Sequence, residues 1–324
     1  MAIFATLLLP LWDDQSIDDA DIIISSVMPL SDDKNILALL PNKQTVTQKQ
    51  YGLLQDIPVK TDGIYVHDGI ALTDQQLKNY ITDTQDIVTT FESSLKRDKL
   101  QCAKNLPVDA LGHVEEMCEL GFIRTLTALV LLHAQYSLDE GQPERAKKLT
   151  LLTLKLGHAL VDQRQAISMI EHLLGRAVMD LSITMLGTIN EIQPVGWNDL
   201  DVYQISAGSL RRAFEGEYLF NKSLILKTID PGLRTPFYFA SPNKTVNSLA
   251  EFNRAEMAVV MTPCTDEIDM SPFAKTMAEN KNVMSFNSFF RPNFVGRLSL
   301  SVLVTPLATK MRQSVCETNQ KLRG

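Results

Sequence analysis

Residues 122–160 read FIRTLTALVLLHAQYSLDEGQPERAKKLTLLTLKLGHAL, and this stretch decides the fold class. Its first half repeats residues on one helical face: Phe122, Leu126, Leu129, His133 and Tyr136. Gly141 then supplies a helix stop, and Pro143 suits the first position of a new helix. The second half carries its own stripe: Leu149, Leu152, Leu156 and Ala159. These features predict an antiparallel helix hairpin.

The segments on either side of the hairpin also have helical patterns. A third stripe follows it, close to a heptad repeat and expected to be buried: Ile167, Ile170, Leu174, Ala177, Leu181 and Met185. Before the hairpin, Thr73 and Gln76 form a capping-box signature that opens a helix running to about Asp98. We therefore predict that residues 72–190 are overwhelmingly helical, with turns near 99–107, 141–143 and 162–166.

The two ends of the chain are less regular. Prolines recur through residues 1–70, which predicts an irregular arm whose short helical candidate runs from Asp33 to Leu40. After the third stripe we expect further helices, at about 199–227, 246–261, 272–279 and from Thr305 and Pro306 onward. The predicted fold is all-α: an irregular helical domain over residues 71–324, with a central antiparallel hairpin and a proline-rich N-terminal arm.

The composition is that of a soluble globular protein, with 45% hydrophobic and 21% charged residues. A net charge of −7 gives no general attraction to phosphate backbones, so nucleic acid is not an expected partner. The charge is uneven, because residues 13–33 hold only acidic groups and residues 291–324 mostly basic ones. These runs are either solvated surface or mutually attractive, and we predict that the two ends lie close together.

The apolar run from Ala2 to Trp12 is shorter than the roughly 20 residues that a membrane helix needs. It also lacks the basic region and cleavage site of a signal peptide. Two interpretations stay open: a remnant of a membrane anchor, or a segment that packs on the body of the protein.

The sequence contains no nucleophile elbow, zinc-binding helix motif, phosphate loop or dinucleotide fingerprint. We therefore expect no catalytic residue, no cofactor and no metal site. The nearest approach to a ligand pair is His113 with Glu116, and the aspartates between Asp13 and Asp21 lack the spacing of an EF-hand. His133 is expected to be a core residue that bonds to a neighbour.

Phe286, Phe289 and Phe290, next to Arg291, form the densest aromatic cluster. Such a cluster is typical of a contact surface when it is exposed, and otherwise fills the space under a loop. These four residues are the candidate contact surface of the chain.

The four cysteines are Cys102, Cys118, Cys264 and Cys316. An even number suits an oxidising compartment but is also ordinary for buried thiols in the cytosol. Cys102 and Cys118 are the pair closest in sequence, and they can join only if a helix begins near His113 rather than at Val108. We expect free thiols.

The hairpin at residues 128–160 resembles a single tetratricopeptide unit, because Ala134, Gly141, Ala146 and Leu151 fall at that repeat's small and apolar positions. The whole chain resembles a group of uncharacterised proteobacterial proteins that have an N-terminal membrane anchor and a helical envelope domain. Trp12 with its acidic followers, residues 35–40, the hairpin and PNFVGRL at 292–298 carry this resemblance. It implies a periplasmic or membrane-associated location, with the anchor absent or reduced to residues 2–12.

Three hypotheses for the function remain. The first is a binding or scaffolding module that holds a protein or peptide partner in the cell envelope. The second is an enzyme or small-molecule carrier with an unfamiliar pocket between helices, using His133 or His158 as a base. The third is a chain that positions an anchor and oligomerises. The absence of catalytic motifs favours the first, although a cytoplasmic location stays open.

Overall fold

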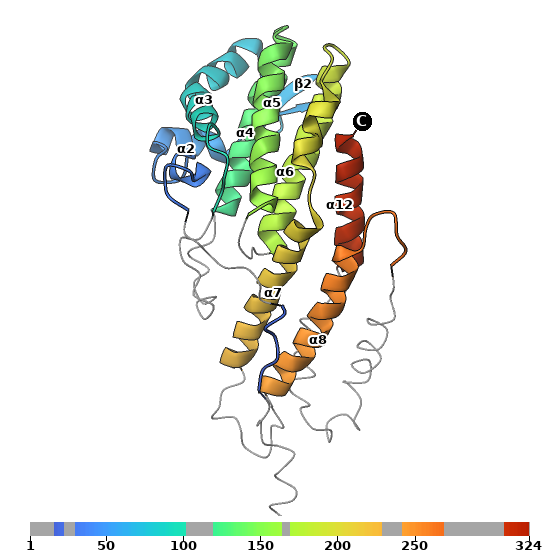
Figure 1. Cartoon of the computed structure of the whole chain (residues 1–324). Helices are drawn as coiled ribbons and strands as arrows, with labels where there is room; N and C mark the ends of the chain where they lie inside the picture. Colours follow the sequence, from blue (N-terminus) through green and yellow to red (C-terminus); the bar gives the residue numbers. More distant parts are fainter. Residues whose placement is uncertain are drawn as a thin grey trace, which may run out of the picture.

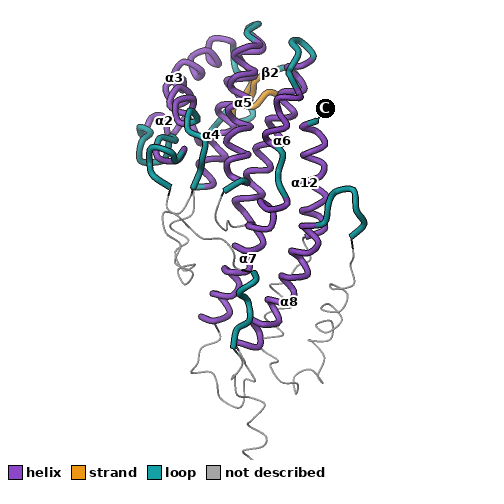
Figure 2. Tube along the Cα trace, in the orientation of Figure 1, coloured by secondary structure: helices purple, strands orange, loops and turns teal. Residues whose placement is uncertain are grey.

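The computed structural model describes residues 16–22, 30–101, 119–163, 169–228, 242–268 and 308–323. Most of these residues are helical, as the sequence predicts, and a small three-stranded sheet accompanies the helices (Figure 2). The helices α4, Leu120–Asp139, α5, Pro143–Val161, and α6, Met169–Asn190, lie side by side in the centre (Figure 1).

A tight turn joins α4 to α5. Gly141 has a φ of 72°, which favours glycine because a side chain would be strained there. The Gly141 and Gln142 amides donate to the carbonyl oxygens of Leu138 and Ser137, which satisfies two groups at the end of α4. Pro143 is the first residue of α5, where its missing amide proton costs nothing.

Helix α5 lies between two hydrophobic cores and contributes to both. Leu149 and Leu156 belong to the core that α5 shares with α4, the N-terminal region and α3, Asp74–Ser94. Leu154 and Val161 belong to the core that α5 shares with α6 and the helices after it. Both sides of α5 are therefore covered.

Helices α5 and α6 approach so closely that their backbones are in contact. A Cβ atom added to Gly157 would lie 2.7 Å from the Gly175 carbonyl oxygen and 2.9 Å from the Met179 nitrogen. A Cβ atom added to Gly175 would lie 2.8 Å from the Gly157 carbonyl oxygen. Only two glycines fit this crossing, because backbone atoms cannot move aside as a flexible side chain can.

The prediction that this third stripe, now located on α6, is buried is wrong. Ile170 and Leu181 are 63% and 56% exposed, Ala177 is exposed, and Leu174 and Met185 are half-buried. Ile167 lies outside the described residues. The buried residues include the small one at the α5 contact: Met169, Glu171, His172, Gly175, Val178, Met179, Ser182, Ile183, Leu186 and Ile189. A heptad pattern is recognised by its large apolar residues, whereas the close contact between α5 and α6 requires a small residue.

Helix α3 begins as predicted. The Thr73 hydroxyl accepts from the Gln76 amide, and the Gln76 side chain accepts from the Thr73 amide. The helix ends at Ser94 instead of near Asp98, and Leu95 closes it by donating to the Phe91 carbonyl oxygen.

The arm expected to be irregular contains regular structure. It forms α2, Gln48–Gln55, and an antiparallel sheet of β1, Val59–Thr61, β2, Ile64–His67, and β3, Ile70–Ala71. The strands pair with Val59 opposite Val66 and His67 opposite Ile70. Only a 3-10 turn, η2, Ile36–Ala38, stands where the short helix was expected.

Two Asp-Gly turns build this sheet. Asp62 and Gly63 have φ values of 51° and 82°, and Asp68 and Gly69 have 49° and 75°. Positive φ at both central residues is the type I′ geometry that matches the twist of a hairpin. The two Asp-Gly pairs are visible in the sequence, but the prediction of an irregular arm rested on its prolines alone.

The sheet is held against the end of α4. Lys60 and Tyr65 both reach Asp139, the last residue of α4, at 2.7 and 2.6 Å. Tyr65 is buried, and its hydroxyl group is the donor in this contact. These two bonds fix the N-terminal region relative to the helices.

The helix expected at 199–227 is divided into η4, Trp197–Tyr203, and α7, Ala207–Thr228. Helix α8, Pro242–Met261, packs along α7, and α12, Ala308–Leu322, packs on α8 and α6. In Figure 1, α7 and α8 extend below the three central helices, and α12 lies beside α6. The segment expected to be helical at 272–279 lies outside the described residues.

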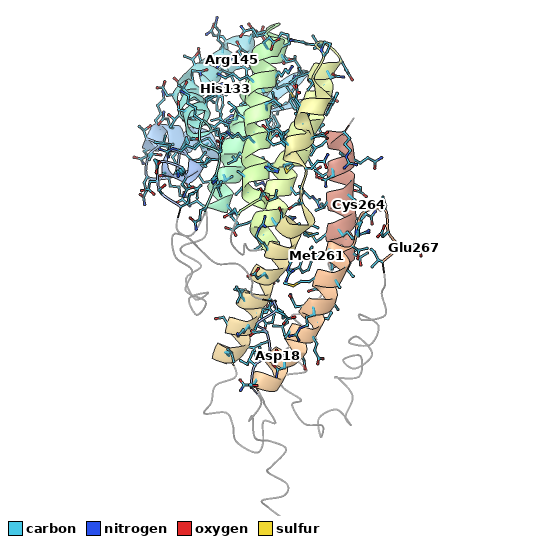
Figure 3. All side chains as sticks on the ribbon, in the orientation of Figure 1. Asp18, His133, Arg145, Met261, Cys264 and Glu267 are labelled. Carbon is cyan, nitrogen blue, oxygen red and sulfur yellow. A yellow bond between two sulfur atoms is a disulfide. The ribbon has the colours of Figure 1, made fainter. Side chains whose placement is uncertain are left out.

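The prediction that the acidic N-terminal run lies beside the basic C-terminal run is wrong for the described residues. Asp19 pairs with Lys222 of α7 at 2.6 Å, and Asp21 pairs with Arg254 of α8 at 2.6 Å. Figure 3 places Asp18 near the far end of α8 from Cys264. Asp19 and Asp21 therefore take their partners from α7 and α8 and not from the basic C-terminal run.

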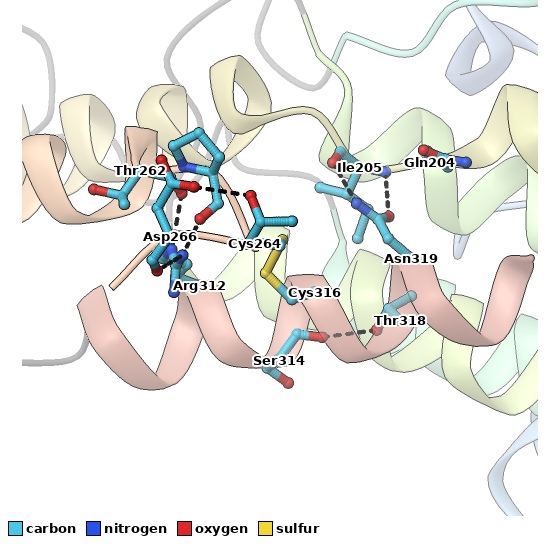
Figure 4. The surroundings of a disulfide bond; sticks show 12 residues. Gln204, Ile205, Thr262, Cys264, Asp266, Arg312, Ser314, Cys316, Thr318 and Asn319 are labelled. Atoms are coloured by element: carbon cyan, nitrogen blue, oxygen red, sulfur yellow. Dashed lines mark hydrogen bonds between the residues drawn. A yellow bond between two sulfur atoms is a disulfide. The ribbon is translucent and has the colours of Figure 1, made fainter. Parts of the chain in front are cut away.

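A disulfide bond fastens α12 to the end of α8. Cys264, just past α8, is bonded to Cys316 of α12, with 5.9 Å between the Cα atoms (Figure 4). Arg312 adds bonds to the carbonyl oxygens of Thr262, Pro263 and Asp266. Free thiols were therefore the wrong expectation for this pair, which helix packing brings together from 52 residues apart. The other two cysteines lie outside the described residues.

We expect the double variant Cys264→Ser/Cys316→Ser to lose about 4 kcal/mol of unfolding free energy at most, because a bridge over a separation of 52 residues restricts the unfolded chain. Urea unfolding followed by circular dichroism measures this loss. Reductant should bring the wild type to the stability of the variant. Equal stability of the oxidised wild type and the variant would contradict the bridge.

Candidate functional site

The exposed face of α6 carries no charged side chain; it is apolar from Ile170 to Leu181 and continues with two threonines. We call it the α6 stripe, and its members point away from α5: Ile170, Leu173, Ala177, Leu181, Thr184 and Thr188. Positions three or four residues apart lie on one side of a helix, so these side chains form a continuous strip. Exposed apolar strips of this kind mark contact surfaces more often than scattered single residues do.

The charges beside the α6 stripe are already paired. Asp180 lies 3.6 Å from Arg176, one turn earlier, and 3.5 Å from Lys321 of α12. The Thr318 hydroxyl of α12 also donates to Asp180 at 3.1 Å. One edge of the strip is thus polar and held in place by α12.

A second feature is a pocket of about 280 Å³ between α3, α4 and α5. Its lining combines polar and apolar surface in similar measure and is drawn from these three helices and the α4–α5 turn: Ile81, Gln85, His133, Tyr136, Ser137, Glu140, Gln142 and Arg145. Arg145 donates to the Gln85 side chain at 3.2 Å. Figure 3 shows His133 and Arg145 near each other at the upper end of the helices.

His133 is buried, as the sequence predicts, and Nε2 lies 2.8 Å from the Thr84 hydroxyl oxygen. Burial, aided by the positive charge of Arg145, lowers the pKa of His133 to about 4. The imidazole is therefore neutral near pH 7 and is a weak base. A neutral imidazole beside a guanidinium suits binding of a polar ligand better than proton abstraction.

Of two further histidines, His158 is half-buried and His172 is fully buried. His158 packs edge-on against Tyr203, with ring centroids 5.6 Å apart, and burial lowers its pKa. His172 has no exposed surface, and neither ring nitrogen has a hydrogen-bond partner among the described residues. Burial, with the charges of Arg176 and Arg212, lowers the pKa of His172 to about 4.

The candidate contact surface of Phe286, Phe289, Phe290 and Arg291 lies outside the described residues. So do His113 and Glu116, the nearest ligand pair in the sequence, and the apolar run at 2–12. Of the aspartates between Asp13 and Asp21, the described Asp18, Asp19 and Asp21 are bound by basic side chains of α7 and α8.

Two separate features of the structure, the α6 stripe and a cluster at the small sheet, were not predicted from the sequence. Three members of the α6 stripe, Ile170, Ala177 and Leu181, were expected from the sequence to be buried, whereas Leu173, Thr184 and Thr188 were not singled out. The donor atoms of Asp56, His67 and Asp68 lie within 4.8 Å of one another, a cluster formed by residues too far apart in sequence for a spacing motif. Recognising that β1 pairs with β2 would have placed Asp56 close to His67 and Asp68.

Comparison with protein-family models, curated proteins and solved structures finds no match to this chain. Among the described helices, none is both long enough and apolar enough to cross a membrane. The function therefore has to be inferred from the surface, the pocket and the charges of the chain itself.

We predict that acid destabilises the protein through His172. Its pKa is about 4 in the folded state and about 6.5 when unfolded, so the unfolded chain binds an extra proton between these values. The free energy of unfolding has its full value above pH 6.5 and decreases as the pH drops towards 4, by about 3 kcal/mol at most.

The variant His172→Leu removes this proton uptake, and it leaves no partner unsatisfied because the ring nitrogens have none. We expect it to be at least as stable as the wild type at pH 8 and clearly more stable at pH 4.5. Urea unfolding across this range is the measurement. If the unfolding free energies of the two proteins change with pH in parallel, His172 takes no part in the acid destabilisation.

Proposed function

We propose that this chain is a binding module that holds a protein partner through an amphipathic helix laid along the α6 stripe. The observation that carries the proposal is the exposure of large apolar side chains on a single helical face, with Ile170 at 63% and Leu181 at 56%. Covering such side chains removes apolar surface from water, which drives association.

The shape of the α6 stripe favours a helix as the partner element. From Ile170 to Thr188 it extends about 27 Å at 1.5 Å per residue, the length of a five-turn helix. Ala177, near the middle, allows close approach, and the larger side chains on either side provide the apolar contact. Helix-in-groove recognition uses partner residues at spacings of three, four and seven, which this strip matches.

We also propose that the module works in an oxidising compartment, the periplasm or another part of the cell envelope. The Cys264–Cys316 bridge supports this location, because disulfides persist mainly where thiols are not kept reduced. Membrane association through residues 2–12 and the single tetratricopeptide-like hairpin remain part of this proposal. A cytoplasmic protein is the alternative.

A second candidate function is that of a carrier or enzyme for a small polar ligand. The pocket beside His133 and Arg145 favours it, because a guanidinium and a neutral imidazole line the same space. It ranks second because Arg145 is engaged with Gln85 and His133 with Thr84, so a ligand would displace existing contacts.

Site-specific photo-crosslinking tests the first proposal. A photoreactive amino acid at Leu181 should yield one discrete adduct with another protein in cells of the native source. The same label at Val202, which is 72% exposed and lies outside α6, should not yield it. The further substitution Leu173→Glu should abolish the adduct without changing the melting temperature, because Leu173 is 40% exposed.

The two candidates predict different results for Arg145→Gln. This variant should leave the Leu181 adduct intact if the α6 stripe is the functional surface, since Arg145 lies on α5 at the pocket. No adduct at Leu181, or an adduct formed only within the chain, would contradict the binding module. A loss of function with Arg145→Gln and none with Leu173→Glu would favour the carrier.

A further inference from the structure

The sheet brings a histidine and two aspartates together from two separate elements. Asp56 caps the end of α2, two residues before Pro58 leads into β1. Because Val59 pairs with Val66, the chain just before β1 lies beside the end of β2, where His67 and Asp68 are found. The end of α2 is therefore placed against the turn between β2 and β3.

The donor atoms of this cluster lie near the spacing of metal ligands. One ligand atom each from Asp56, His67 and Asp68 lies within 4.8 Å of the other two. The ligand atoms of a tetrahedral Zn²⁺ site, each about 2.1 Å from the ion, stand about 3.4 Å apart, so side-chain rotations would have to bring the three atoms closer together. The two aspartates are exposed and His67 is half-buried, which leaves room for such rotations.

No hydrogen bond or ion pair from the described part of the chain engages these three side chains. Two carboxylates therefore stand beside an imidazole without a lysine or arginine to balance them. A divalent cation would match their charge. Elsewhere on the same surface the pattern differs, since Asp83 and Asp139 each have a lysine partner.

We propose that Asp56, His67 and Asp68 bind a divalent first-row transition-metal ion such as Zn²⁺. One nitrogen and two oxygen donors suit this class, whereas Mg²⁺ and Ca²⁺ take oxygen ligands and larger coordination numbers. Three protein ligands on an open surface leave at least one position for water. The ion would join the end of α2 to the sheet, independently of the α6 stripe.

The chain contains a matched control for this site. Asp62 and Gly63 form a turn with φ values of 51° and 82°, nearly those of Asp68 and Gly69 at 49° and 75°. Thr61 precedes Asp62, whereas His67 precedes Asp68, so the first turn has the same backbone but no imidazole. Asparagine tolerates positive φ, so Asp62→Asn and Asp68→Asn both preserve their turns.

Isothermal titration of the full chain with ZnCl₂ at pH 7.5 tests the proposal. We expect one ion per chain, and a loss of affinity of about tenfold or more in His67→Ala, Asp56→Asn and Asp68→Asn. Asp62→Asn should bind as the wild type does. Lowering the pH to 5.5 should weaken binding, because a ligating imidazole must be unprotonated.

Circular dichroism of each variant without metal provides the folding control, and these exposed positions should leave the spectrum unchanged. Equal Zn²⁺ affinity in His67→Ala and the wild type would overturn the proposal. So would Mg²⁺ binding as tight as Zn²⁺ binding, which would indicate an acidic surface only. Absence of measurable Zn²⁺ binding by the folded wild type would overturn it as well.

Discussion

The backbone contact between Gly157 of α5 and Gly175 of α6 is the constraint on which the rest of the structure depends. It leaves no space for even a methyl group, because each added Cβ would lie within 2.8 Å of a carbonyl oxygen of the other helix. Such an approach fixes both the separation of the two helices and the face that α6 turns inward. Helix α5, whose other side packs on α4, thereby becomes the wall between two cores.

The orientation of α6 explains why its apolar stripe faces solvent. A helix that turns Gly175 and Ser182 inward must turn the residues on the opposite side outward, and these include Ile170 and Leu181. Apolar residues on both sides of a helix are usual when the helix is covered on both sides. The helix α6 has this composition, and we infer that a partner supplies the second cover. The glycine contact and the proposed function are thus two consequences of one arrangement.

The same arrangement directs the later helices. Helix α12 packs against α6 beside the stripe, where Asp180 binds both Thr318 and Lys321. The bridge from Cys316 to Cys264 and the bonds from Arg312 then hold α12 at the end of α8. Covalent and polar contacts thus hold α12 in place. The core that α12 shares with α6, α7 and α8 therefore does not need a cover over the α6 stripe.

Local signals in the sequence predicted local structure well. The Thr73–Gln76 capping box, the positive-φ Gly141 and the helix start at Pro143 each depend on residues within a few positions, and each is found in the structure. The Asp-Gly turns at Asp62 and Asp68 are signals of the same kind. The sheet was not predicted, because the prolines of this region were taken to indicate irregular structure. These features were all available from the sequence.

Features that depend on distant contacts were not available. The buried face of α6 is set by Gly157 of another helix, and the disulfide joins cysteines 52 residues apart. The partners of Asp19 and Asp21 are Lys222 and Arg254, more than 200 positions away. The pocket at His133 and the cluster at His67 likewise combine residues from separate elements. A spacing rule along one chain segment contains no information about such pairs.

Urea unfolding of two glycine variants of α6 tests the central constraint most directly. Gly175 meets the backbone of α5, whereas Gly187 has no other atom within 4 Å of an added Cβ. Alanine favours a helix over glycine by about 1 kcal/mol, so Gly187→Ala should stabilise the protein by up to that amount. Gly175→Ala should instead lower the unfolding free energy by about 2 kcal/mol, because overpacking outweighs the helix preference. A Gly175→Ala protein as stable as Gly187→Ala would contradict the account.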